Sequence, residues 1–134
     1  MVIRETASEL DLSGTPAELR AIGRAVAALG PGERCRFEAD AHADPAPYTR
    51  VLAALVVEAS GGPVRVSVAG QVLAASGSPD MLARFASFFV FSDADRPGTH
   101  AHHEWWDGNE YIAADSRPLV IRAAEPGAAA DRGA

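Results

Sequence analysis

The 134-residue sequence contains no lysine, a single cysteine and no long hydrophobic run. All twelve basic residues are arginines, and this bias, together with abundant alanine and glycine, is typical of GC-rich genes rather than of a binding site. Cys35 has no second cysteine with which to form an internal disulfide bond. The apolar stretches are far shorter than the roughly 18 residues that a membrane-spanning helix needs, and the N-terminus lacks a secretory signal pattern. We therefore expect a soluble, cytoplasmic protein with no membrane association.

Acidic residues exceed basic ones by 18 to 12, so the formal net charge is −6. The arginines are scattered and form no basic stripe, so nothing offsets the repulsion between this charge and a phosphate backbone. The sequence also lacks a phosphate-binding loop with Lys and Ser/Thr chemistry and a strand–turn–helix nucleophile elbow. We predict that the protein binds no nucleic acid, is not an enzyme and needs no cofactor.

A helix is predicted to start near residue 15. Thr15 is followed by Pro16 and, three residues after the cap, by Glu18, which is a capping box with proline at the first helical position. Apolar residues at helical spacing continue to Leu29, and Gly30-Pro31 supplies a stop signal. Only one face of this helix is apolar, so we expect it to pack against a sheet or another helix.

Strands are predicted before and after this helix. Leu10 and Leu12 alternate with acidic residues, which is the pattern of a strand with one apolar face. After the helix, Cys35 shares a face with Phe37, since successive side chains of a strand point to opposite sides. The alternation therefore predicts a buried structural thiol rather than a reactive cysteine.

The middle of the chain is predicted to form a run of short strands. Residues 51–59 are apolar and partly β-branched, and they fit either a strand or a helix. Residues 64–68 alternate strictly between apolar and polar side chains, and a tight turn leads from them into 72–74. We predict a meander of consecutive antiparallel strands.

A second helix is predicted to begin at Ser78, which precedes a proline and an acidic first turn. Its large apolar side chains keep helical spacing on one face. They are Met81, Leu82, Phe85, Phe88 and Phe89. We predict that this stripe belongs to the core, and the alternative is a phenylalanine-lined ligand groove or a dimer surface.

These elements, with a last strand at 118–121, predict an α+β fold in which two helices pack on one face of a mostly antiparallel sheet. One domain is expected over residues 1–123, since the length and the 48% apolar content suit a single core. Residues 124–134 contain no large apolar side chain and are predicted to be a disordered tail.

Residues 93–115 concentrate the negative charge of the chain. They contain six acids and one arginine, so they contribute −5 of the net −6, and they also hold three of the four histidines and both tryptophans. An acidic, aromatic-rich segment on an otherwise nearly neutral chain is typical of a docking surface for a basic protein partner.

Within this segment a strand is predicted from His100 to Trp106, between two turn signals that contain glycine. Alternation places His100, His102 and Glu104 on one face. Two imidazoles and a carboxylate suit zinc or iron, so a small metal- or ligand-binding domain or a metalloenzyme is the alternative to a docking surface. Same-face side chains on a strand are about 7 Å apart, however, so the three converge only with a bulge, and we predict no metal site.

Trp105 and Trp106 are consecutive, so on a strand one points inward and the other outward. Trp106 shares its face with His100 and His102, and we predict that it is the exposed one and anchors a partner. Acidic neighbours would speed association with a basic surface. The predicted partner-binding residues are Glu104, Trp105, Trp106, Asp107, Glu110, Tyr111 and Asp115.

The C-terminal third, from His100 to Ile121, resembles a small α+β immunity-protein family of bacterial polymorphic toxin systems. The likeness lies in a His-rich strand that ends in Glu-aromatic, followed by Gly-x-x-Tyr-Ile-Ala-x-Asp-Ser-x-Pro-Leu-Val-Ile. Trp106 with Asp107 departs from the pattern, because an aromatic residue followed by proline is expected there. The resemblance implies tight binding and neutralisation of a cognate toxin, without catalysis.

Overall fold

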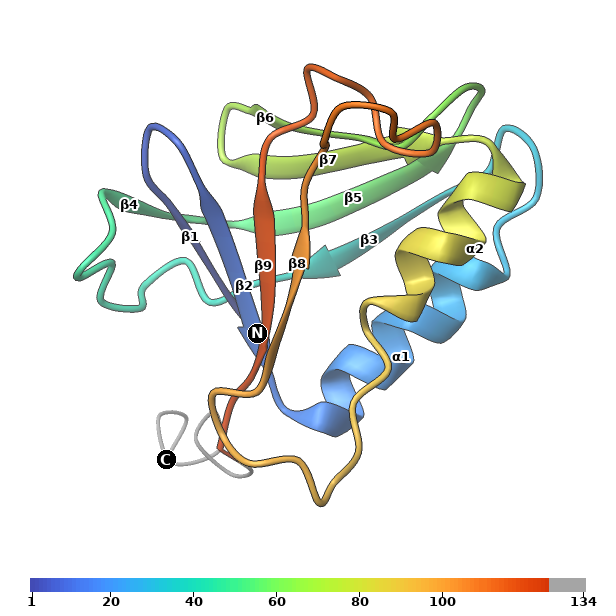
Figure 1. The fold of residues 1–134 in the computed structure, drawn as a ribbon. Coiled ribbons are helices and arrows are strands. Elements are labelled where there is room, and N and C mark those ends of the chain that lie inside the picture. Colours follow the sequence, from blue (N-terminus) through green and yellow to red (C-terminus); the bar gives the residue numbers. More distant parts are fainter. Residues whose placement is uncertain (126–134) are drawn as a thin grey trace.

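The computed structural model describes residues 1–125 and shows two β-sheets and two helices (Figure 1). The predicted α+β class is confirmed, but the strands form two sheets rather than one. Both sheets are mixed, since five of the seven strand pairings in this part of the chain are antiparallel and each sheet contains one parallel pairing. The tail predicted at 124–134 lies outside the described residues except for its first two positions.

The first sheet has five strands in the order β4-β1-β2-β9-β8. Its strands are β1 (Val2–Glu5), β2 (Leu10–Gly14), β4 (Arg50–Leu52), β8 (His100–His103) and β9 (Leu119–Ala123). The parallel pairing of β2 with β9 places Leu12 opposite Ile121. β1 was not predicted, because its four residues are too few to show a clear alternation.

The second sheet has four strands in the order β3-β5-β7-β6. Its strands are β3 (Arg34–Glu38), β5 (Ala54–Ala59), β6 (Arg65–Ala69) and β7 (Val72–Gly77). The predicted meander is wrong, because β5 pairs in parallel with β7 and β6 lies at the edge. β5 is the most apolar of the four and is mostly buried, so the central position, with a partner on each side, suits it better than it suits β6.

Residues 50–59 connect the two sheets. From the sequence, residues 51–59 fitted either a strand or a helix. The structure shows two strands, β4 in the first sheet and β5 in the second, separated by Ala53. At this point Ala53 N–H donates to Gln71 O at 2.7 Å and its own carbonyl accepts from Ala39 N–H at 2.9 Å. The chain therefore changes sheets without leaving a backbone group of Ala53 unpaired.

The two helices begin where the sequence predicts. α1 (Pro16–Ala27) has the complete capping box, in which Glu18 N–H donates to Thr15 Oγ1 at 3.1 Å and Thr15 N–H donates to Glu18 Oε1 at 2.9 Å. α2 (Pro79–Ser87) is capped by Ser78, whose hydroxyl accepts from Met81 N–H at 3.3 Å. Neither helix of the described chain is long and apolar enough to cross a membrane.

α1 and α2 lie side by side (Figure 1) and approach closely at Gly23. A Cβ atom at this position would lie 3.1 Å from the carbonyl oxygen of Ala86 and 3.2 Å from the Cβ of Phe89. A side chain here would therefore require Ala86 or Phe89 to shift by a few tenths of an ångström, so glycine suits this position because of the close approach and not because of an unusual backbone angle.

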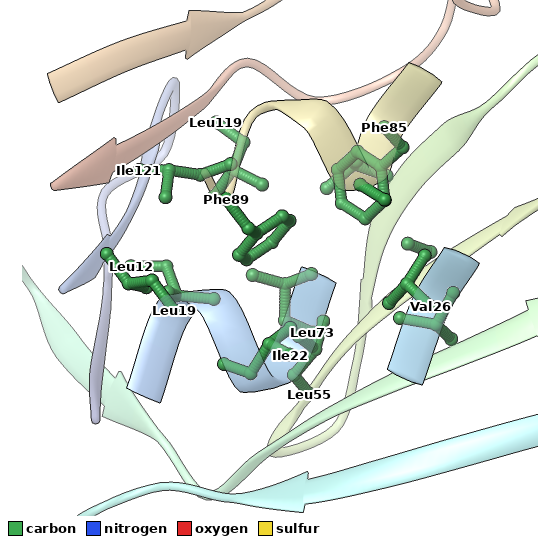
Figure 2. Close-up of a cluster of buried hydrophobic side chains, with 14 of the residues drawn as sticks. Leu12, Leu19, Ile22, Val26, Leu55, Leu73, Phe85, Phe89, Leu119 and Ile121 are labelled. Carbon is green, nitrogen blue, oxygen red and sulfur yellow. The ribbon is translucent and has the colours of Figure 1, made fainter. Parts of the chain in front are cut away.

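Both sheets and both helices contribute to one hydrophobic cluster (Figure 2). Phe85 and Phe89 from the α2 region are fully buried and pack edge to face, with ring centroids 5.3 Å apart. Figure 2 shows them among side chains of α1, of β5 and β7, and of the first sheet. The prediction that this stripe belongs to the core is confirmed for these two rings and for Leu82, which is also fully buried, whereas Met81 and Phe88 are only partly buried.

Candidate functional site

β8 ends at His103, three residues earlier than predicted. The reason lies on β9, its neighbour. His103 pairs with Leu119, which is preceded by Pro118, and Arg117 N–H donates to Val66 O of the second sheet at 2.8 Å. Proline offers no N–H, and the chain before it has already turned toward the other sheet, so β8 has no partner strand beyond His103.

The predicted alternation holds along the four residues of β8. His103 is fully buried and Ala101 is partly buried, whereas His100 and His102 are exposed on the opposite face. The rings of His100 and His102 are 4.9 Å apart, centroid to centroid. Glu104 lies beyond the end of the strand, and within residues 1–125 no three His, Cys, Asp or Glu side chains form a group that could hold a metal ion.

His103 is enclosed by aromatic rings. Its centroid is 5.0 Å from Phe85, 5.0 Å from Phe88 and 5.8 Å from Tyr111, with each pair of planes close to perpendicular. Neither ring nitrogen has a hydrogen-bond partner within the described chain. Burial lowers the pKa of His103 to about 4, and the neutral ring is therefore the form that the fold accommodates at pH 7. We call these four residues the aromatic cage.

Tyr111 belongs to this cage more than to an exposed surface. Its hydroxyl oxygen is buried with no partner in the described chain, and burial raises its pKa to about 12. The guanidinium of Arg84 lies over its ring, 5.7 Å from the centroid. Of the seven predicted partner-binding residues, Tyr111 is the one that the structure places mainly inside.

The chain after the cage is fixed along the outer edge of β6. Val64 N–H donates to Tyr111 O at 2.7 Å and Val64 O accepts from Ala113 N–H at 2.8 Å. Two residues further along β6, Val66 N–H donates to the buried hydroxyl of Ser116 at 2.8 Å. This segment therefore covers an edge strand that would otherwise present open backbone groups.

Residues 104–110, here called the indole loop, lie between these two fixed points. Trp105 is 38% exposed and Trp106 is 61% exposed, so the prediction that one of them points inward is wrong. Strand alternation does not apply to them, since β8 has already ended. Trp106 is the more exposed of the two, as predicted.

Three carboxylates surround the tryptophans in the indole loop. Glu104, Asp107 and Glu110 are exposed, and none of them forms a salt bridge with another residue of 1–125. Asp115, also predicted as a partner contact, lies outside the loop, and its carboxylate accepts from Arg65 Nε at 2.8 Å. The loop therefore carries three carboxylates without a salt-bridge partner in the described chain together with the two exposed indoles.

The sequence analysis did not predict a polar cluster that lies on the outer face of the first sheet. Asp11 is 3% exposed, and its Oδ2 accepts from the hydroxyl of Tyr48 at 3.1 Å and from Arg122 Nη2 at 2.9 Å. Arg122 lies directly opposite His100. Asp11 in an otherwise apolar strand was the available signal, but its partners are 37 and 111 residues away.

The indole loop offers recognition chemistry: two exposed aromatic side chains and three unpaired negative charges on a segment fixed at both ends. The one fully buried histidine of the described chain is shielded by its cage, and its ring nitrogens form no hydrogen bond within that part of the chain. Comparisons with protein-family models, with curated protein sequences and with solved structures each find no match for this chain.

Proposed function

We propose that this protein is a binding module for a basic protein surface, and that it acts as an immunity protein that neutralises a cognate bacterial toxin in the cytoplasm. The observation that carries the proposal is the exposure of Trp105 and Trp106 beside three carboxylates without ion-pair partners in the described chain. The resemblance of residues 100–121 to immunity proteins supports the choice of partner class.

The two kinds of side chain have different roles in this proposal. Trp106 is an anchor, since tryptophan is enriched among the few interface residues that dominate binding energy. Asp107 and Glu110 act at longer range and steer a basic partner during encounter.

The way in which the loop is held supports the same function. His103 is fixed in the aromatic cage before the loop. Near the end of the loop, Asn109 Oδ1 accepts from Tyr111 N–H at 2.8 Å and from Ile112 N–H at 3.1 Å, which ties the loop to the segment that follows it. A loop that is ordered before binding loses less conformational entropy when the partner docks.

The test begins with isolation of the partner and a measurement of toxicity. A protein captured from the source bacterium by this chain should arrest growth when it is expressed alone, and co-expression of this chain should restore growth. Absence of any captured protein that arrests growth, or failure of co-expression to restore growth, contradicts the immunity function.

Surface plasmon resonance with that partner then locates the site. Trp106→Ala should accelerate dissociation roughly thirtyfold, which corresponds to about 2 kcal/mol. Asp107→Asn and Glu110→Gln should mainly slow association and flatten its salt dependence. Glu58→Gln removes an exposed charge from β5 and is the matched control. Unchanged rate constants in all indole-loop variants would place the binding site elsewhere.

A further inference from the structure

β3 is the longest open sheet edge in the described chain. The edges of the first sheet are β4, with three residues, and β8, with four. In the second sheet the outer side of β6 is covered by the segment that follows the indole loop, whereas β3 has five residues and a partner on one side alone. Figure 1 shows β3 along the outside of the second sheet.

The backbone of β3 presents alternate residues to this open side. Ala39 N–H donates to Ala53 O and Ala59 N–H donates to Glu33 O, so the odd-numbered residues of this strand face β5. By the alternation of an antiparallel ladder, the N–H and C=O groups of Arg34, Arg36 and Glu38 face outward. The run of outward-facing backbone groups without a partner ends at Asp40, whose N–H donates to Met1 O at 2.9 Å.

The side chains of β3 are complementary to a second copy of themselves. If two β3 strands pair antiparallel about Arg36, each Arg34 lies opposite Glu38 of the other copy, which forms two ion pairs. The two Arg36 side chains meet at the axis, but Nε of each already donates to its own Glu38 at 2.6 Å. The outward backbone groups of the two strands match in this register.

The apolar face of β3 fits the same arrangement. Cys35 and Phe37 pack against the core, and a cleft of about 380 Å³ lies between β3 and α1. Its lining is part apolar, with Met1, Ala21, Ile22 and Phe37, and part charged, with Glu18, Arg36 and Glu38. In the proposed register each Cys35 lies opposite Phe37 of the other copy, on the side of this cleft. Apolar side chains of the second strand are therefore directed toward a cleft whose lining is partly apolar.

We propose that two copies of this chain form a symmetric dimer through β3, with Arg36 on the two-fold axis. The two four-stranded sheets then become one eight-stranded sheet, and the same patch on each copy forms the interface. The ladder removes the open edge of the second sheet and leaves the indole loop uninvolved, so the dimer does not rest on the proposed function.

A charge-swap cycle tests the pairing. The wild type should sediment at twice the chain mass of 14.0 kDa in analytical ultracentrifugation. Arg34→Glu places one acid opposite Glu38 of the other copy in each half of the interface, and it should raise the dissociation constant of the dimer at least about tenfold. The double variant with Glu38→Arg should restore the dimer. A monomeric wild type, or no rescue in the double variant, overturns the proposal.

Cross-linking tests the register. Cys35 and residue 37 of the other copy form a pair without backbone hydrogen bonds, whose Cα atoms lie about 4.5 Å apart, within the range of a disulfide. With diamide as oxidant, Phe37→Cys should give a covalent dimer in non-reducing electrophoresis. Neither the wild type nor Cys35→Ala/Phe37→Cys should do so. A covalent dimer in either control indicates a different register, and its absence from the Phe37→Cys variant overturns the proposed one.

Discussion

The aromatic cage and the indole loop are adjacent in the chain and are both rich in aromatic side chains, but they lie in opposite environments. The cage encloses His103 so completely that the ring has no polar partner within the described residues, whereas both tryptophans of the loop are exposed. Aromatic content alone therefore does not distinguish a buried cluster from an exposed surface. The two environments separate at the point where β8 loses its partner strand. Three substitutions and one change of pH test whether stability depends on the cage and not on the loop.

The largest effect is expected inside the cage. Phe85→Ala removes a fully buried ring that contacts both His103 and Phe89, and it should lower the free energy of unfolding by roughly 3 to 5 kcal/mol, since it leaves a cavity. Urea denaturation followed by circular dichroism measures this. A loss below about 1 kcal/mol would show that the cage can collapse around the missing ring.

Acidification should weaken the cage next. The pKa of His103 is about 4 in the folded chain against 6.5 for an ordinary histidine, so the native state binds this proton more weakly than the unfolded state. The contribution of neutral His103 to the free energy of unfolding is complete above pH 6.5. It is lost as the pH falls toward 4, and the total loss is about 3 kcal/mol at most. His103→Phe should therefore gain stability relative to the wild type over this range in urea denaturation.

A second titratable group, Glu5, also contributes to the pH dependence of stability, and Phe88→Leu serves as the control for a change in the cage. Burial opposes the ionised form of Glu5, but hydrogen bonds from Arg117 and Arg50 outweigh it and lower the carboxyl pKa, so its contribution is lost at pH values below about 4.5. Phe88→Leu alters the cage without removing a titratable group and should change stability equally at every pH. A constant offset for His103→Phe would show that His103 does not control the pH dependence.

A smaller effect is expected where the chain after the loop is fixed. Ser116→Ala leaves the buried N–H of Val66 without its acceptor and should cost about 1 to 3 kcal/mol. Hydrogen exchange at the Val66 amide should accelerate. Ser67→Ala, on the same strand, is the control and should leave that amide protected, and equal exchange in the two variants would show that Ser116 does not hold this edge.

The smallest effect is expected in the indole loop. Trp106→Ala should change the free energy of unfolding by about 0.5 kcal/mol or less, because the side chain is 61% exposed. Thermal and urea denaturation would check this. A loss comparable with that of Phe85→Ala would mean that the indole supports the fold, and the division between cage and loop would then fail.

Local signals in the sequence were sufficient for the helix starts and for much of the core. Thr15 with Glu18, and Ser78 before its proline, act within a few residues, so their caps could be predicted. The spacing of Phe85 and Phe89 likewise identified a buried face without knowledge of the partner elements.

The arrangement of the strands and the state of the tryptophans depended on distant contacts. β8 stops at His103 because Arg117 pairs with Val66 instead of continuing the ladder with β9, and no pattern within 100–106 encodes that choice. The same holds for Asp11 with Arg122, since a pair that far apart in the sequence becomes visible only when β2 and β9 are neighbours.

The parallel pairing of β2 with β9 has a consequence for synthesis of the chain. β9 lies between β2 and β8 although it is the last strand of the described chain to be translated. Until residues 119–123 leave the ribosome, β2 has an open side and Leu10 and Leu12 lack their neighbours on it. Contacts between such distant segments form slowly and late. The nascent chain thus exposes one side of β2 until β9 is made, and β9 supplies the neighbour of both β2 and β8.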